Sequence, residues 1–457
     1  MRTGFQSSVF VASAFLALAG CQAPAPRVDL PDQIARQTQI AAPITWLSDG
    51  QPLDVAETAA DASTLSLLRA TQLAVSNSPQ LQSALWKVRQ AQADDDQQRL
   101  WPNPILAMVM RFPEGGGKPA LEASLAGDLL AILKRGRGIT AADDRLRAAS
   151  AQALKEAADQ VSQAQQTYIA AAIVDEELAV LSTRHELLDR LLQTSRARLR
   201  AGEGTRLDVT TLEGQALELE AEIADKEAER TDQRLILARI IGRPGGSIDW
   251  KLEPLAALTQ DLAPERSWVQ AGLQHRPELD ALRWELLALG EEAQLAKWNL
   301  FDPAEIGVAS QRDPDWQVGP TLSLPLPIFD TGQAKQDKAT AARMAAVHEF
   351  VAAQRGVVEE VRRAYAALLA ARAAASRTTE RLLPLQEQRR DLAEKAYKAG
   401  ESDLTTLLLA EDTLQTSRFK ALELREKAAV ARVQLERAVG GRGAAATLST
   451  TRPATQP

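Results

Sequence analysis

The residues that could do acid–base, metal or phosphate chemistry are few in this sequence and do not cluster. Its three histidines, His185, His275 and His348, lie far apart, without the cysteine partners or His-Glu-x-x-His spacing of zinc sites. The adjacent carboxylates Glu359 and Glu360 fit an ordinary solvated helix surface. The glycine-rich stretches GEGTR and GGGK lack the other residues of a phosphate-binding loop. We therefore expect no enzyme activity, no metal site, no bound cofactor and no energy source in this chain.

One residue near the N-terminus does indicate covalent chemistry. An apolar run from Val9 to Leu18 follows Arg2 and ends in Leu-Ala-Gly before Cys21, the only cysteine. Such a run is typical of a signal peptide, here residues 1–20, and is too short for a membrane-spanning helix. The sequence around Cys21 resembles a bacterial lipobox, which implies a lipid, palmitate included, on that cysteine. Gln22 favours delivery to the outer membrane, because an Asp there implies retention at the inner membrane.

The rest of the chain is a tandem duplication with an offset of 198 residues. Four pairs of residues share this offset: Pro79 and Pro277, Trp86 and Trp284, Gly202 and Gly400, Gly242 and Gly440. We assign repeats to residues 62–242 and 265–440, an N-terminal extension to 21–61, a linker to 243–264 and a disordered tail to 441–457. The net charge of −7 gives no support for nucleic-acid binding, which needs a basic face.

Most of both repeats is predicted to be helical. Frequent Ala favours helix, and we expect helices over 62–100, 139–200, 207–241, 265–299, 333–398 and 404–439. The second of these would be roughly 93 Å long, so it needs a partner along its length. The last carries two heptad series: Leu407, Leu414, Ala421, Ala428, Leu435, and Ala410, Ser417, Leu424, Ala431, Ala438. This pattern predicts a coiled-coil seam of small residues, which is equally compatible with a structural rod.

Two segments, 102–137 and 301–331, interrupt the helices and are predicted to be β-hairpins. In the second, apolar positions alternate with small or polar ones: Ile306, Val308, Trp316, Val318, Pro320, Leu322, Leu324 against Glu305, Gly307, Ala309, Gln311, Gln317, Gly319, Thr321, Ser323. The return strand of the first alternates Leu121, Ala123, Leu125, Leu129 with Glu122, Ser124, Ala126, Asp128. The apolar face would pack on a soluble core or face lipid in a barrel. Trp101 and Trp298 stand where helix meets hairpin, which suits an interfacial aromatic girdle or an ordinary helix junction.

The order helix, hairpin, long helix, glycine break and helix, occurring twice, resembles the TolC-like outer-membrane efflux channels. The segments LSLPLPIFDTGQAKQDKATAA (322–342), AYKAGESDLTTLLLAEDTLQTS and QLERAVGG carry this resemblance, which covers roughly residues 62–440. It implies a mainly α fold with a small β part. Long coiled-coil hairpins would form a periplasmic α-barrel, and two β-hairpins per chain would contribute four strands to a trimeric, 12-stranded transmembrane β-barrel.

The same resemblance implies the function and the partners. The chain would be a homotrimeric, passive channel in the outer membrane, lipid-anchored and extending into the periplasm. A periplasmic adaptor protein and an inner-membrane transporter would complete a tripartite export system. The alternative is a lipid-anchored periplasmic coiled-coil scaffold without a pore.

The glycine breaks at 202 and 400 are the candidate functional sites. Gly202 and Gly400 suit a tight turn with positive φ, and Thr205, Ser402 and Asp403 suit caps of the returning helices. In the family such tips gate the pore and dock the adaptor. The resemblance therefore assigns docking to Gly202, Glu203, Thr205, Gly400, Glu401, Ser402, Asp403 and Leu404. Asp208, Leu409 and Asp412 are the gate candidates; Leu409 stands where many relatives have an acidic residue.

Overall fold

The computed structural model describes residues 29–41, 46, 64–112, 114–116, 119–256, 262–312 and 315–450. These residues fall into two compact units. Unit 1 contains Ser83–Ala153 and Pro277–Gln354, and unit 2 contains Leu30–Gln82, Leu154–Arg276 and the chain from Arg355 onward. Each unit combines segments of both repeats, so the units do not coincide with the sequence repeats. The signal peptide and Cys21 lie outside the described residues.

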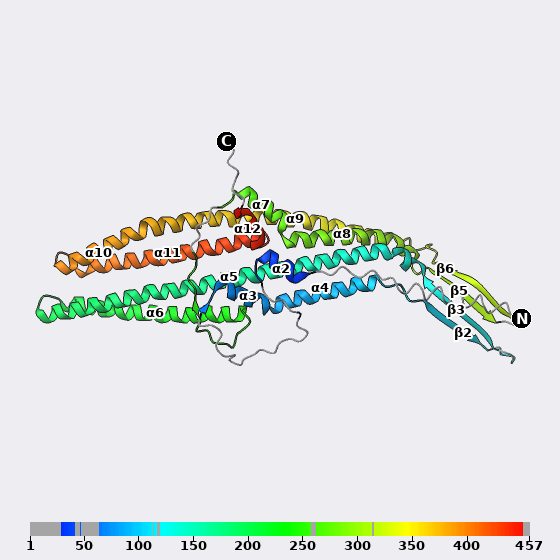
Figure 1. Ribbon diagram of the computed structural model, residues 1–457, viewed down its shortest axis with the longest axis horizontal. Helices are drawn as coiled ribbons and strands as arrows, with labels where there is room; N and C mark the ends of the chain where they lie inside the picture. Colours follow the sequence, from blue (N-terminus) through cyan, green and yellow to red (C-terminus); the bar gives the residue numbers. More distant parts are fainter. Residues whose placement is uncertain are drawn as a thin grey trace, which may run out of the picture. The chain divides into compact units, whose positions relative to one another are not determined.

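The same order of elements occurs twice along the chain (Figure 1). The first series is α3 (Leu67–Ser76), α4 (Pro79–Gln98), β2 (Ile105–Arg111), β3 (Ala120–Asp128), α5 (Leu129–Ala201) and α6 (Arg206–Ile240). The second is α7 (Glu265–His275), α8 (Pro277–Trp298), β5 (Glu305–Arg312), β6 (Trp316–Ser323), α9 (Gln333–Arg377), α10 (Leu383–Ala399) and α11 (Leu404–Ala438). The helices α2 (Leu30–Thr38) and α12 (Arg442–Thr450) and the short strands β1 (Thr64–Leu65) and β4 (Lys251–Leu252) lie outside this series.

Two of the helices predicted as single are each divided before a proline. Pro79 and Pro277 are the first residues of α4 and α8. A proline lacks the amide hydrogen that a helix interior needs, but it is well suited to the first helical position. The buried Ser78 accepts a hydrogen bond from the Leu81 amide at 3.1 Å and so starts α4. The predicted single helices over 62–100 and 265–299 are therefore wrong at these points.

The helix α5 is longer than the sequence predicted. It begins at Leu129, directly after β3, because the Asp128 side chain accepts a hydrogen bond from the Ala131 amide at 2.9 Å. Residues 129–137, assigned to the first hairpin, are helical, and Leu129 is not part of the strand. Gly136 and Gly138 do not end the helix, although glycine in a helix costs roughly 0.5–1 kcal/mol relative to alanine.

Two further differences concern the second repeat. The helices α9 and α10 are joined by a π-helical turn, Thr378–Leu382, so the predicted helix over 333–398 is continuous but not uniformly α-helical. Residues 442–450, predicted as part of a disordered tail, form α12, which packs against α2 and α7. None of the described helices is both long enough and apolar enough to cross a membrane.

In unit 1 the four longer strands form one antiparallel sheet in the order β2-β3-β5-β6 (Figure 1). Each predicted hairpin is present, and β3 pairs with β5 to join them, for example at Leu125 opposite Val308. Within the described residues β2 and β6 each pair on one side only. The sheet therefore ends in two strand edges whose backbone groups are available to another chain.

The two faces of this sheet differ in polarity. Residues directly opposite in the register share a face, so one face carries Leu106, Met108, Met110, Leu121, Leu125, Ile306, Val308, Trp316, Val318 and Leu322. We call it the apolar face. The opposite face carries Glu122, Ser124, Asp128, Glu305, Gln311, Gln317, Thr321 and Ser323, and on it Arg111 pairs with Glu122 at 3.1 Å. The predicted alternation is confirmed, and most large side chains of the apolar face are exposed.

In unit 2 the heptad seam predicted for the last helix is confirmed. Leu407, Ala410, Leu414, Ala431 and Leu435 are buried, and the other seam positions are at least half-buried. The backbone just after α11 also lies close to the last residue of α7. A side chain at Gly440, whose φ is +98°, would clash with the His275 carbonyl oxygen. Glycine is required there both for its backbone conformation and for lack of space.

Candidate functional site

The two turns predicted at Gly202 and Gly400 have the same backbone structure. Their φ angles are +79° and +77°. The Gly202 and Gly400 amides donate to the carbonyls of Leu199 and Tyr397, both at 3.1 Å. The next amide in each turn, of Glu203 or Glu401, donates five residues back at 2.9 Å. This pair of bonds is the Schellman motif, in which a left-handed glycine closes a helix and satisfies its last carbonyls.

The returning helices start at side-chain caps. Thr205 and Asp208 form a capping box, in which each side chain accepts a hydrogen bond from the backbone amide of the other. Asp403 caps α11 by accepting hydrogen bonds from the Thr406 amide at 2.9 Å and the Thr406 hydroxyl at 2.6 Å. The bond from the hydroxyl, followed by the bond from the amide, lowers the pKa of the Asp403 carboxyl. Ser402, also predicted as a cap, does not have this role, because the N-terminal position of α11 belongs to Asp403.

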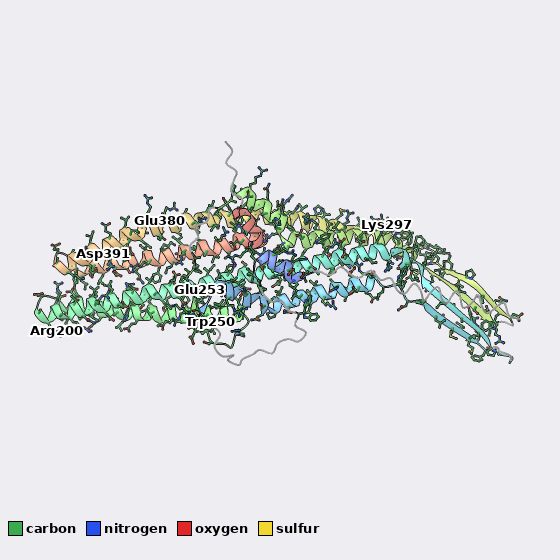
Figure 2. The ribbon with its side chains drawn as sticks, in the orientation of Figure 1. Arg200, Trp250, Glu253, Lys297, Glu380 and Asp391 are labelled. Carbon is green, nitrogen blue, oxygen red and sulfur yellow. The ribbon has the colours of Figure 1, made fainter. Side chains whose placement is uncertain are left out.

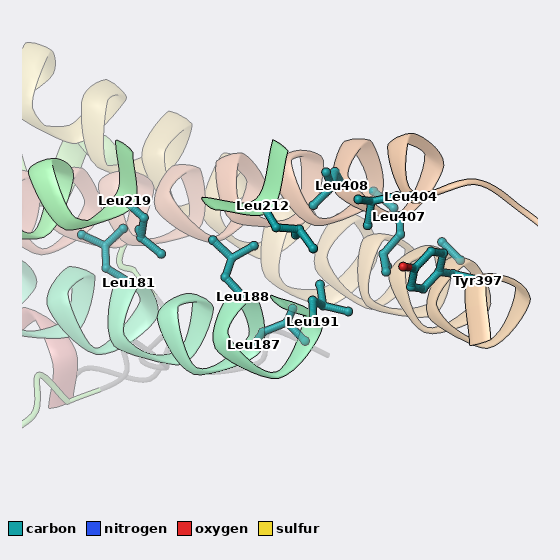
Figure 3. Close-up of a cluster of buried hydrophobic side chains, with 12 residues drawn as sticks. Leu181, Leu187, Leu188, Leu191, Leu212, Leu219, Tyr397, Leu404, Leu407 and Leu408 are labelled. Atoms are coloured by element: carbon teal, nitrogen blue, oxygen red, sulfur yellow. The ribbon is translucent and has the colours of Figure 1, made fainter. Parts of the chain in front are cut away.

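A cluster of apolar side chains holds α5, α6, α10 and α11 together near these turns (Figure 3). We call it the tip cluster; it consists of Leu181, Leu187, Leu188, Leu191, Leu212, Leu219, Ala393, Tyr397, Leu404, Leu407, Leu408 and Ala410. Leu404 is only 6% exposed and lies near Leu407 and Tyr397 (Figure 3). The prediction that Leu404 presents a docking surface is therefore wrong for this arrangement of the chain: its side chain belongs to the packing beneath the turn.

Polar contacts connect the first helical hairpin, α5 and α6, with the second, α10 and α11. The Arg198 guanidinium lies over the Tyr397 ring, 5.3 Å from its centre. Arg184 lies 3.7 Å from the Asp412 carboxylate and also pairs with Glu222 on α6 at 4.0 Å. Arg200, the last basic residue of α5, lies beside the turn (Figure 2). Both tips are thus held to each other by the tip cluster and by long cationic side chains.

A buried ionic group lies next to the tip cluster. Glu411 on α11 is 5% exposed, and its Oε2 lies 3.8 Å from Nε of Arg390 on α10, without a hydrogen bond between them. Burial raises the pKa of the Glu411 carboxyl, while Arg390, Arg418 and Arg184 oppose this effect and Glu394 adds to it. The guanidinium of Arg390 has a closer partner, since its Nη1 lies 3.0 Å from Glu394. The ionised form of Glu411 is therefore poorly accommodated in the packed tip.

The structure places the predicted site residues in different surroundings. Gly202, Glu203, Thr205, Gly400, Glu401 and Asp403 are exposed on the two turns, and Ser402 is half-buried. Among the gate candidates, Leu409 is 58% exposed, Asp412 is paired with Arg184, and Asp208 is half-buried in the capping box. No group of three or more metal-ligating side chains occurs in the part of the chain that the structure describes.

The contacts of Arg198, Tyr397, Arg390 and Glu411 were missed by the sequence reasoning. A signal for two of them was present, because the duplication offset places Tyr397 opposite Leu199 and Arg390 opposite Leu192. A polar residue where the other repeat has leucine marks a contact that the two halves do not share. The partners could not be found this way, because they depend on how the two hairpins pack.

We predict that the packed tip becomes less stable as pH rises. The raised pKa of Glu411 means that the packed state holds the proton more tightly than the open state, so protection falls from pH 4.5 upward through the raised pKa. Hydrogen–deuterium exchange protection of peptides from α10 and α11 measures this change. Glu411→Gln should abolish this part of the pH dependence and protect the peptides better at neutral pH.

The control for this prediction is Glu401→Gln, which changes an exposed carboxylate on the adjacent turn. It should keep the pH dependence of the unmodified protein. Identical pH profiles for the unmodified protein and Glu411→Gln would contradict the prediction.

Comparison with known proteins identifies proteins whose sequences are similar to this chain. Residues 268–441 match the family model described as "Outer membrane efflux protein". The cobalt-zinc-cadmium resistance protein CzcC of Cupriavidus metallidurans is 23% identical over 384 residues, covering 82% of this chain and 90% of that protein.

Solved channel structures share the fold. The outer-membrane channel OprN superposes with a TM-score of 0.70 at 17% identity, covering 93% of this chain and 98% of OprN. VceC of Vibrio cholerae gives 0.68 at 19% identity, covering 82% and 96% of the two chains. The fold is thus that of a helical barrel with a β-barrel part, and residues 268–441 of the chain match the family of outer membrane efflux proteins.

Proposed function

We propose that this protein is the outer-membrane channel subunit of a tripartite export system, a passive conduit from the periplasm to the exterior. The observation that carries the proposal is the sheet of unit 1, with an exposed apolar face, a polar opposite face and two unpaired edges. Strands of this kind are stable in a bilayer only in a closed barrel whose polar face lines water. A periplasmic scaffold without a pore gives no role to the exposed apolar face.

The number of strands supports assembly from several copies. The smallest transmembrane barrels have about eight strands, and this chain supplies four, so one copy is too few. Pairing of the β2 edge of one copy with the β6 edge of the next would close a ring. Three copies would give a barrel of twelve strands, as the TolC-like resemblance implies. Trp101 and Trp298, each nearly half exposed beside the strands, would then mark the periplasmic membrane interface.

The chain's composition supports a passive role. Its sequence contains no phosphate-binding loop, so the energy for export would come from an inner-membrane transporter coupled through a periplasmic adaptor. We propose that substrate choice also lies with the transporter. The turns at Gly202 and Gly400 would dock the adaptor, because they expose Glu203, Glu401 and other polar groups.

Gating would then be a rearrangement of the two tips. Leu409 is exposed on α11, whereas Asp412 is held by Arg184, so we propose Leu409 as the pore-lining gate residue and the Arg184–Asp412 and Arg198–Tyr397 contacts as the restraints on opening. Asp208 would act through the capping box, as a structural residue of the first tip.

We also propose that Cys21 carries a lipid that tethers the chain to the outer membrane. The proposal rests on the Leu-Ala-Gly-Cys sequence after an apolar run. The lipid would tether the chain to the membrane, while the barrel would hold the protein across the bilayer.

The channel function is tested in planar bilayers. We expect the protein purified in detergent to be trimeric and to show small, rarely open conductance, because closed tips leak little without partners. Weakening the restraints by Asp412→Ala together with Tyr397→Ala should raise the open fraction. A monomer that stays in solution without detergent would instead support the scaffold.

The docking role of the turns is tested by two variants with intact packing. A side chain at Gly400 would meet no atom within 4 Å, so Gly400→Val should cost only the backbone strain of a left-handed residue, roughly 1–2 kcal/mol. Glu401→Arg reverses the charge of an exposed residue on the same turn. Both variants should yield normal amounts of trimer while crosslinking to the adaptor and substrate export are lost.

Leu404→Arg is the contrasting control, because it places a charge inside the tip cluster and should reduce the yield of trimer itself. Normal export and crosslinking by both Gly400→Val and Glu401→Arg would show that the turns only connect helices. Loss of the trimer in these two variants would place the residues in assembly.

The lipid anchor is tested by Cys21→Ser. The variant should lose labelling by radioactive palmitate and processing by the lipoprotein signal peptidase, while trimers still form. Equal labelling of the variant and the unmodified protein would exclude Cys21 as the lipid site.

A further inference from the structure

The apolar alternation of β6 continues beyond the end of the strand. Along β6, the even-numbered side chains from Trp316 to Leu322 lie on the apolar face. Leu324, Leu326 and Ile328 continue the same alternation, with exposures of 47%, 74% and 71%, and Phe329 is 100% exposed. We call residues 324–329 the apolar extension. Six consecutive residues with four large exposed apolar side chains are unexpected on a surface that faces water.

The two prolines reduce the number of backbone amide donors in the apolar extension. The positions between the apolar residues are Pro325 and Pro327, which have no amide hydrogen. The Ile328 amide donates to the Leu326 carbonyl at 2.8 Å. The chain then turns at Gly332, whose amide donates to the Asp330 side chain at 2.8 Å, and α9 begins at Gln333. The prolines thus lower the number of amides that need a hydrogen-bond partner, which favours the water-containing boundary of a membrane over its hydrocarbon centre.

In the first repeat, the junction between the last strand and the long helix has a different backbone structure but also exposes apolar side chains. The helix α5 starts there without a loop, and Ile132 and Leu133 in its second turn are exposed. Apolar residues end abruptly in both repeats: Lys134 follows Leu133, and Asp330 follows Phe329. The Lys134 ammonium lies 2.9 Å from the Asp302 carboxylate. Both repeats therefore contribute charged residues next to the exposed apolar ones.

The strands alone are short for the apolar part of a membrane. They contain seven to nine residues, hence about 24–31 Å of extended chain. At a tilt of about 35–45° they would rise roughly 17–25 Å, at or below the ~25 Å apolar band of outer-membrane barrels. Residues 324–329 and the first turns of α5 would supply the missing height on the periplasmic side.

We propose that the apolar extension, together with Ile132 and Leu133, inserts into the periplasmic leaflet of the outer membrane. Its partner would be the glycerol and upper acyl region of phospholipids, at the headgroup/acyl boundary that interfacial apolar side chains enter to a depth of about 5–10 Å. The inference rests on the proposed channel function. Lipid fits better than a second copy of the chain, because a second copy would meet β6 at its strand edge. Leu324, Leu326 and Ile328 instead continue the alternation of the apolar face.

The test uses fluorophores attached to single introduced cysteines. Leu326→Cys and Phe329→Cys, made in the full-length lipidated protein, are labelled with an environment-sensitive dye and reconstituted into phosphatidylethanolamine–phosphatidylglycerol vesicles. We expect quenching by lipids with a nitroxide near the glycerol to exceed quenching by aqueous iodide several-fold. Ser323→Cys is the matched control: it lies one residue from Leu322 and Leu324 on the polar face and should show the reverse preference.

Trimer content and conductance of the same labelled samples separate this inference from the channel function. A sample that inserts and conducts, but whose position 326 is quenched by iodide as strongly as position 323, would overturn only the lipid contact. Protection from both quenchers, with crosslinking between positions 326 and 101 of neighbouring subunits, would assign the surface to a second copy and also overturn the proposal. Failure to insert at all would overturn the channel function as well.

Discussion

The structure depends on one constraint: the sheet of unit 1 cannot satisfy its own backbone. The order β2-β3-β5-β6 leaves β2 and β6 paired on one side only among the described residues, and the apolar face is not covered. Each unpaired polar group costs several kcal/mol where no water reaches it, so strands of this kind need closure by other strands before they enter lipid. Assembly of copies, a polar lumen and an apolar outer surface all follow from that requirement.

The tips are subject to a different requirement, since under the proposed gating they would have to be both stable and able to separate. Their turns are fixed by backbone hydrogen bonds and caps that are nearly the same in the two repeats. The contacts between the tips are not the same, because Arg198–Tyr397 and Arg184–Asp412 join residues without equivalents in the other repeat. Glu411, buried without a hydrogen bond to its Oε2, makes this packing less favourable when ionised. The interactions that stabilise each turn are therefore different from the side-chain contacts that hold the two turns together.

The junction between strands and helices differs between the repeats although the sequence is duplicated. In the first repeat α5 follows β3 directly, with Asp128 as its cap. In the second the apolar extension and Gly332 come between β6 and α9. The two solutions expose apolar side chains at the same point and change to charged residues at Lys134 and Asp330. Both junctions are explained if this position requires apolar residues followed by charged ones, and does not require one particular backbone structure.

The sequence alone determined the features that arise from local or periodic constraints. The duplication, the two hairpins, the heptad seam and the left-handed glycines were readable, because strand alternation, helical period and positive φ act on neighbouring residues. The ends of helices were less well predicted: α5 begins at Leu129 and not at the expected residue 139, because the Asp128 cap starts the helix directly after β3. Only the tertiary structure decided which tip residues are buried. Leu404 was predicted to present a docking surface beside the turn. It is enclosed, as is Glu411, because two helical hairpins far apart in sequence pack against each other.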